Sequence, residues 1–262
     1  MIVRKLLILA MLAAWAWTLA GEDFDPEAFA GSIRELTNQA RAENGLQPLK
    51  RESGLDDLAA LHSRNMARDE RFDHVDSQGM SVEGRALAYY PEFLQVGIGE
   101  NLYLIESSKR EFDPHRVVQG WLASPGHRAN ILDTDYTHIG IGICQSGDKL
   151  YSTQVFATPL VKILTPLPAK FSPDKEYAVE FEYLSTEPQD EFRCLVATPD
   201  PSTQIGIDAS TYYEGLMPVT VEWLGARRFR LKLDFRYGPG TYKLQFGWGG
   251  FFYPDLYSFT VK

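Results

Sequence analysis

The sequence predicts an α+β first half followed by an all-β second half. Two observations carry this prediction: amphipathic helical periodicity is found before about residue 135, and closely spaced strand-like runs fill the chain from about residue 176. The distribution of histidines also separates the two halves. All 5 histidines precede residue 140, whereas the second half is rich in Tyr, Phe and Trp. Any histidine chemistry therefore belongs to the first half.

The first 20 residues have the pattern of a signal peptide. Arg4 and Lys5 precede an apolar run over 6–17, and we expect cleavage after Ala20. This run is shorter than the roughly 20 apolar residues that a membrane-spanning helix needs. We therefore expect an exported chain, secreted or periplasmic, whose mature form has no transmembrane anchor.

Length and charge limit the architecture and the partners. Residues 21–262 exceed the roughly 100–150 residues of one ordinary domain, so two domains are expected. The formal net charge is −9, and loss of Arg4 and Lys5 with the signal peptide makes it −11. Nucleic acids and anionic lipid surfaces bind basic patches, so this acidic composition argues against both.

The first two helices are expected over 25–43 and 53–70. The pair Asp25-Pro26 is a helix start signal, and Ser53 is positioned to cap the second helix. His62 falls on the apolar stripe of that second helix. A buried imidazole with a hydrogen-bond partner is the more ordinary role there than a metal ligand.

Two further helices are expected over 113–123 and 125–132. Asp113-Pro114 begins the longer one, and Ser124-Pro125 provides a fresh cap for the short one. His127 then lies in a first helical turn, where the positive end of the helix disfavours a protonated ring. A cap at Ser124 would engage its hydroxyl, which argues against Ser124 as a nucleophile.

A pair of strands is expected over 138–144 and 150–157. In HIGIGIC, isoleucines alternate with small residues, so one face is bulky and the other is nearly bare. Gly140 and Gly142 permit a close approach by a neighbouring element on the bare face. These elements complete a first domain over 21–162.

A proline-containing linker over 163–175 is expected to lead into a second domain over 176–262. About seven short runs separated by turn signals predict an immunoglobulin-like β-sandwich there. The runs cover 176–184, 191–198, 203–208, 218–224, 227–235, 241–247 and 255–261. The aromatic stretch FGWGGFFYPDLY at 246–257 is interpreted either as sandwich core, which the alternation favours, or as an exposed patch that stacks on sugars or a partner.

The two cysteines fall one in each half. In an oxidising compartment Cys144 and Cys194 could form a disulfide between the domains, or each could be a small buried hydrophobic residue. The sequence leaves both alternatives open.

Three candidate site residues stand in distinctive local contexts: His74 in RFDHVDSQG, Glu100 in GIGENLY and His127 in SPGHRANIL. With these motifs the chain resembles the CAP superfamily of cysteine-rich secretory, antigen 5 and pathogenesis-related proteins, in its bacterial SCP-like branch. The resemblance extends over about residues 26–160. Its matching stretches are HSRNMARDERFDH, GEN, GWLASPGHRANIL, YTHIGIGI and YSTQVFA.

The resemblance implies a CAP-type α-β-α sandwich with a central cleft lined by two histidines and two acids. His74, His127 and Glu100 match three of these positions. The second acid falls near Ser124, which cannot replace a carboxylate, and His138 or Asp135 is the candidate substitute.

Two imidazoles and one carboxylate are the ligand types of an open zinc site, so His74, Glu100 and His127 are predicted to hold zinc or another divalent cation. The leading hypothesis is a cleft that binds an extracytoplasmic protein, glycan or lipid. One alternative is a metal-assisted, peptidase-like hydrolase acting on extracytoplasmic polymers. Another is a non-catalytic structural or adhesion protein in which the same residues form a hydrogen-bonded network.

Overall fold

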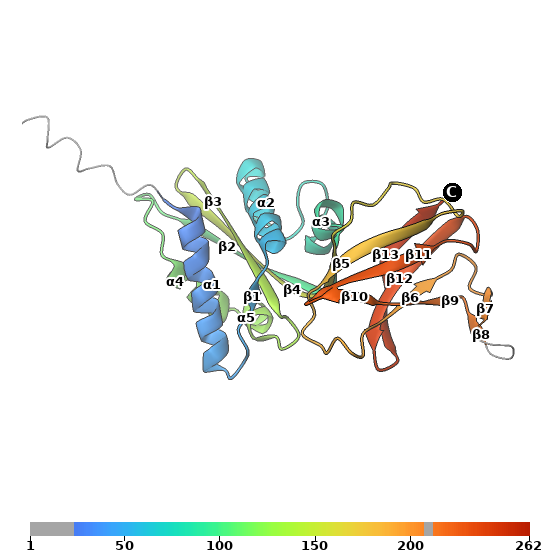
Figure 1. Ribbon diagram of the computed structural model, residues 1–262. Coiled ribbons are helices and arrows are strands. Elements are labelled where there is room, and N and C mark those ends of the chain that lie inside the picture. Colours follow the sequence, from blue (N-terminus) through green and yellow to red (C-terminus); the bar gives the residue numbers. More distant parts are fainter. Residues whose placement is uncertain (1–23, 207–211) are drawn as a thin grey trace, which may run out of the picture.

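The computed structural model describes residues 24–206 and 212–262 (Figure 1). The predicted signal peptide over 1–20 lies outside the described residues. Within them, no helix combines the length and the apolar character that crossing a membrane requires. The first half contains, in chain order, α1 (Pro26–Glu43), β1 (Lys50–Arg51), α2 (Ser53–Asp69), α3 (Val82–Tyr89), β2 (Phe93–Glu106), α4 (Pro114–Ala123), α5 (Pro125–Leu132), β3 (His138–Ser146) and β4 (Lys149–Ile163).

The strands of the first half form a sheet between two helical layers. β4 pairs antiparallel with both β2 and β3, and β1 adds to β3 in parallel. One face of the sheet is covered by α1, α4 and α5, which share a core with β3 and β4. The opposite face is covered by α2 and α3, as Figure 1 shows. The predicted α-β-α layering is therefore present.

Local sequence explains most helix ends, although the cap predicted for α2 is wrong. The Asp25 side chain accepts from the Glu27 backbone N–H at 2.9 Å and begins α1, as expected. At α2, however, the cap is Glu52 and not Ser53. Ser124 is the N-cap residue of α5, as predicted, and its carbonyl accepts from the Arg128 N–H at 2.8 Å, but its hydroxyl makes no capping hydrogen bond.

The bare face of β3 is packed against α2, which confirms the predicted close approach. A Cβ added to Gly140 would lie 2.1 Å from the Leu55 carbonyl carbon, and one added to Gly142 would lie 2.0 Å from the Ala60 nitrogen. Both collisions involve helix backbone. The two glycines therefore set how near α2 lies to the sheet, and α2 precedes the loop that carries His74.

Besides the two-residue β1, two elements of the first half were not predicted. α3 has only 8 residues, too few for a clear apolar period. β2 has 14 residues, but its glycines at 97 and 99 interrupt the strand pattern. Both elements position the candidate site, since α3 carries Arg85 and β2 carries Glu100.

The second half contains β5 (Glu176–Tyr183), β6 (Arg193–Ala197), β7 (Gln204–Gly206), β8 (Tyr212–Glu214), β9 (Leu216–Val219), β10 (Glu222–Gly225), β11 (Arg228–Asp234), β12 (Gly240–Trp248) and β13 (Phe251–Val261). One sheet has the order β13-β12-β6-β9, and β5, β11 and β10 belong to the other. The two sheets enclose one aromatic-rich core. The run expected at 218–224 is divided between β9 and β10, in different sheets. The immunoglobulin-like assignment of this half stays a prediction.

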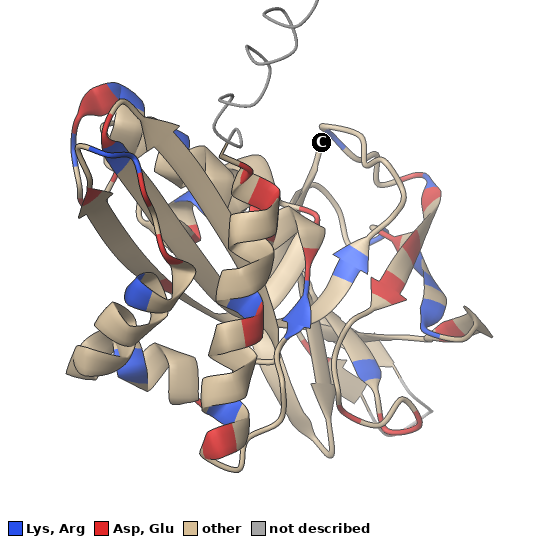
Figure 2. Cartoon of the chain, turned by 90° about the vertical axis from the view of Figure 1, so that its left-hand side faces the viewer, with Lys and Arg blue, Asp and Glu red and all other residues tan. Residues whose placement is uncertain are grey.

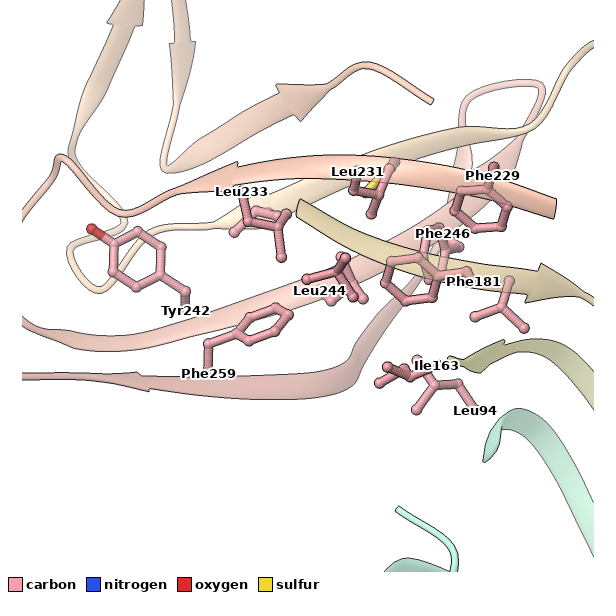
Figure 3. Close-up of a cluster of buried hydrophobic side chains, with 14 of the residues drawn as sticks. Leu94, Ile163, Phe181, Phe229, Leu231, Leu233, Tyr242, Leu244, Phe246 and Phe259 are labelled. Atoms are coloured by element: carbon pink, nitrogen blue, oxygen red, sulfur yellow. The ribbon is translucent and has the colours of Figure 1, made fainter. Parts of the chain in front are cut away.

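The two halves share a continuous sheet. The end of β4 pairs with β5, with Val161 opposite Tyr183 and Ile163 opposite Phe181. Figure 3 shows Leu94 and Ile163 of the first half against the core residues of the second. The segment predicted as a linker, 163–175, connects these paired strands, and its Phe171 is buried in the same core. It therefore packs as part of the fold.

The aromatic stretch over 246–257 is only partly buried. Phe246 is buried, Trp248 and Tyr253 are partly buried, and Phe251 is 62% exposed, so this stretch belongs to the core at Phe246 and to the surface at Phe251.

The two cysteines, Cys144 and Cys194, are both free, which rules out the disulfide alternative in this structure. Burial raises the pKa of both thiols, as expected for small hydrophobic residues.

Candidate functional site

Glu100 is the centre of the candidate site. Its side chain is buried on β2, and its Oε1 accepts a hydrogen bond from Nδ1 of His74 at 2.9 Å. Its Oε2 accepts from Nη2 of Arg85 in a buried ion pair. A buried carboxylate is costly unless it is paired and hydrogen-bonded, and both conditions are met here.

Arg85 connects the carboxylate to the loop that carries His74. Its side chain is fully buried, and its Nη1 donates to the backbone carbonyls of His74 and Met80, each at 2.9 Å. One guanidinium therefore holds both members of the His74–Glu100 pair. Sequence reasoning missed Arg85, although a signal exists: a single arginine stands among apolar residues in GRALAYY.

His74 is fixed in place but open to solvent. Its side chain is 56% exposed, and the hydrogen bond to Glu100 is the main cause that raises its pKa above the ordinary value of 6.5. With Nδ1 bonded to Glu100, the other ring nitrogen, Nε2, is left for a ligand. His62 lies behind it, with Nε2 at 3.0 Å from the Asp73 carbonyl oxygen and 3.8 Å from Oε1 of Glu100. Its role as a buried, hydrogen-bonded residue is confirmed.

His127 lies in the first turn of α5, close enough to His74 for the charge of that ring to act on it. Burial, and secondly the charge of His74, lower its pKa below 6.5. The neutral ring expected from the sequence is thus favoured, although burial and not the helix end is the main cause. Asn101 holds the backbone of His127 in place. Its Nδ2 donates to the His127 carbonyl at 3.0 Å and to Oε1 of Gln154 at 3.0 Å.

Asn130 completes this polar network. Its Nδ2 donates to the Glu100 carbonyl at 3.2 Å and to Oδ1 of Asn101 at 2.9 Å, which ties α5 to β2. Sequence reasoning missed this residue, because a single Asn in a short helix carries no functional signal. The network fixes the backbone positions of Glu100 and His127.

The other candidate residues lie elsewhere. His138 is buried on β3 with Nδ1 at 2.9 Å from Oγ1 of Thr137, and burial lowers its pKa to about 4. Asp135 lines a separate cleft between the two halves. Within 24–206 and 212–262, no hydrogen bond or ion pair joins His138, Asp135 or Ser124 to His74, Glu100 or His127. The site observed is therefore the Glu100 carboxylate, paired with Arg85 and hydrogen-bonded to His74, with His127 close enough to feel the charge of His74.

A divalent cation needs ligand atoms that are free to coordinate it. Both oxygens of Glu100 are already engaged, and the described residues contain no group of three His, Cys, Asp or Glu side chains placed to hold a metal ion. Glu100 therefore does not fit as a direct ligand in this arrangement. It fits as the carboxylate that orients a ligating histidine, because such histidines usually donate their second ring N–H to a carboxylate.

The two histidines are expected to titrate on opposite sides of pH 6.5. By ¹H–¹⁵N NMR of the imidazole rings, His74 should show a pKa above this value and His127 one below it. Because the folded pKa of His74 is raised, its pairing with Glu100 stabilises the fold below pH 6.5, and this contribution is lost as the pH rises through the folded pKa. In Glu100→Gln the His74 pKa should fall. An unchanged His74 pKa in that variant would contradict the assigned hydrogen bond.

Comparisons with known proteins define the class. Residues 34–158 match the CAP family, described as the cysteine-rich secretory protein family. This part of the chain belongs to the CAP superfamily, and the resemblance noted from its motifs is confirmed.

Particular relatives are bacterial. The chain is similar to the "Uncharacterized membrane protein YlbC" of Bacillus subtilis, with 35% identity over 124 residues, 47% of this chain and 33% of that protein. It is also similar to the "Uncharacterized protein YkwD" of Bacillus subtilis, with 33% identity over 120 residues, 46% of this chain and 44% of that protein. The chain therefore spans less than half the length of these curated relatives.

Solved structures with similar folds include an extracellular protein containing an SCP domain from Bacillus anthracis, with 28% identity and a TM-score of 0.43, covering 50% of this chain and 41% of that one. An outer surface protein from Borrelia burgdorferi matches with 20% identity and a TM-score of 0.45, covering 52% of this chain and 97% of that one.

Proposed function

We propose that this protein is an exported CAP-domain protein whose cleft binds a ligand through His74 and His127. The observation that carries the proposal is the chain of interactions from Arg85 through Glu100 to His74. In this chain the buried Arg85 and Glu100 hold the exposed imidazole of His74 in one orientation. A side chain held in this way loses little entropy when it binds, and preorganisation of this kind favours ligand recognition. The ligand classes expected are an extracytoplasmic protein, glycan or lipid.

The protonation states limit what the cleft recognises. His74 is a hydrogen-bond donor through Nε2 when protonated, and its raised pKa extends that state toward neutral pH. His127 favours the neutral ring, which offers an acceptor. A ligand with an anionic or acceptor group beside a donor group is complementary to this pair.

A divalent cation is the second ligand that the pair supports. His74 and His127 would hold it through ring nitrogens, and Glu100 would keep the His74 ring in the ligating orientation. Such an ion would supply an acidic bound water or a bridge to an anionic ligand. Zinc binding here stays a prediction that titration tests.

Isothermal titration of Zn²⁺ into the metal-stripped protein is expected to show uptake of one ion. The double variant His74→Ala/His127→Ala should abolish it, and Glu100→Gln should weaken it by about 10- to 100-fold, the usual effect of losing such an orienting carboxylate. His115→Ala is the matched control, because this histidine lies at the start of α4, outside the site. Uptake unchanged in the double variant would remove the metal from the proposal.

The hydrolase alternative has the His74–Glu100 pair in its favour, since an oriented imidazole can act as a general base. In the described ranges, however, no Ser, Thr or Cys side chain is hydrogen-bonded to His74 or His127. Hydrolysis would therefore have to use water as the nucleophile. Ligand binding requires no further group and is the function that this geometry supports best.

A further inference from the structure

A second cleft lies between the two halves of the molecule, apart from the His74 site. It has a volume of about 630 Å³ and is bounded by the bulge of β2, the loop between α5 and β3, the loop after β5, and the β12–β13 hairpin. His74, Glu100 and His127 do not line it. The continuous pairing of β4 with β5 joins its two sides, so the cleft is preformed.

The cleft is acidic. Asp133, Asp135 and Glu187 line it, and no lysine or arginine does. In the described part of the chain, none of these three carboxylates has a lysine or arginine nitrogen within 4.0 Å. Arg41 donates to the Asp133 carbonyl at 2.7 Å, and its charge partly offsets that of Asp133. The charges of Asp135, from the first half, and Glu187, from the second, remain available to a cationic ligand. Figure 2, by contrast, shows charges of both signs interspersed over the helices of the first half.

Aromatic rings line the same cleft. Tyr136 comes from the first half, and Trp248, Phe251 and Tyr253 come from the β12–β13 hairpin. The indole of Trp248 is fixed by its Nε1 hydrogen bond to the Pro188 carbonyl at 2.9 Å. Phe251 meets Tyr253 edge to face at 4.9 Å. The exposed ring of Phe251 adds apolar surface to a cleft that already carries negative charge.

The backbone of β2 also contributes. The pairing of β2 with β4 skips Val96 and Gly97, both of which line the cleft. A peptide that enters the cleft would therefore contact the main chain of Val96 and Gly97, which is not in register with β4, as well as the side chains.

We propose that this cleft binds a basic peptide segment of a partner protein. A lysine or arginine side chain would place its cationic group between the carboxylates of Asp135 and Glu187 and over an aromatic face, an arrangement favourable through both ion pairing and cation–π attraction. A neutral glycan would stack on the rings but would leave the carboxylates of Asp135 and Glu187 without a counter-charge. The observed charge therefore favours the basic peptide.

The test uses fluorescein-labelled heptalysine and the full chain, with binding followed by fluorescence anisotropy at low ionic strength. The double variant Asp135→Asn/Glu187→Gln is expected to weaken binding about tenfold, because each of two exposed ion pairs contributes roughly threefold. Phe251→Ala should weaken it about threefold, on the scale of one exposed cation–π contact. All three positions are exposed, so these variants should fold.

The matched control is Glu106→Gln/Asp148→Asn, which removes two exposed carboxylates outside the cleft. Its binding should stay within about twofold of the parent. Equal weakening by the control and the cleft variant would overturn the proposal in favour of non-specific attraction. Chitohexaose binding that is lost in Phe251→Ala and unaffected by Asp135→Asn/Glu187→Gln would also overturn it, in favour of a neutral glycan.

Discussion

Replacing Arg85 with methionine is expected to lower the free energy of unfolding by about 3–5 kcal/mol, the cost of removing one partner from a buried ion pair. The side chain of Arg85 is fully buried, and Glu100 beside it would keep a charge with only His74 as a hydrogen-bond partner. The carbonyls of His74 and Met80 would lose their donor as well. The predicted loss therefore combines an uncompensated charge with two unsatisfied acceptors.

Urea unfolding followed by circular dichroism measures this loss, and the double variant Arg85→Met/Glu100→Gln separates its causes. If the uncompensated charge dominates, the double variant should be more stable than Arg85→Met alone, since neither buried charge remains. Arg64→Met is the matched control, because this arginine is exposed on α2, and it should change stability by no more than about 0.5 kcal/mol. A loss in Arg85→Met no larger than in Arg64→Met would refute the assigned ion pair.

Gly142→Ala is expected to destabilise the protein by about 3 kcal/mol or more, at the upper end of the cost of overpacking a core. The added Cβ would lie 2.0 Å from the Ala60 nitrogen and 2.1 Å from the Ala59 carbonyl carbon. Both atoms belong to the backbone of α2, so no side-chain rotation relieves the collision. The helix would have to move off β3, and the loop that carries His74 would move with it.

Thermal unfolding of Gly142→Ala and Gly126→Ala provides the comparison. Gly126 lies in α5 with no atom within 4 Å of its added Cβ, so its replacement should be neutral or stabilising by up to about 1 kcal/mol. Because Gly126 adjoins His127, this control also reports whether the site tolerates a change that avoids collision. Equal melting temperatures for the two variants would contradict the close packing of α2 on β3.

Elements with strong local signals could be predicted from the sequence. Asp25-Pro26 and Asp113-Pro114 begin α1 and α4 as expected, because a capping side chain and a proline act within one turn. The alternation in HIGIGIC indicated both β3 and the close approach to its glycines. His74 and Glu100, named from their motifs, are hydrogen-bonded to each other.

The contacts that hold the site residues in place depend on tertiary structure and could not be predicted from local sequence. Arg85 acts through contacts with residues 11 and 15 positions away, on a helix too short to show a period. His138 was a plausible fourth site residue, but β3 places it beside Thr137 and away from Glu100. Local pattern predicts where a chain turns and which face is apolar, whereas long-range packing selects which polar side chains meet.

The joining of the two halves was likewise a tertiary result. Prolines over 163–175 indicated a linker, yet β4 and β5 pair on either side of it and Phe171 enters the core. This pairing depends on residues 18 to 22 positions apart, which no local signal specifies. Composition and periodicity thus determined two differently built halves, and the three-dimensional fold decided that they share one sheet, with the acidic, aromatic cleft between them.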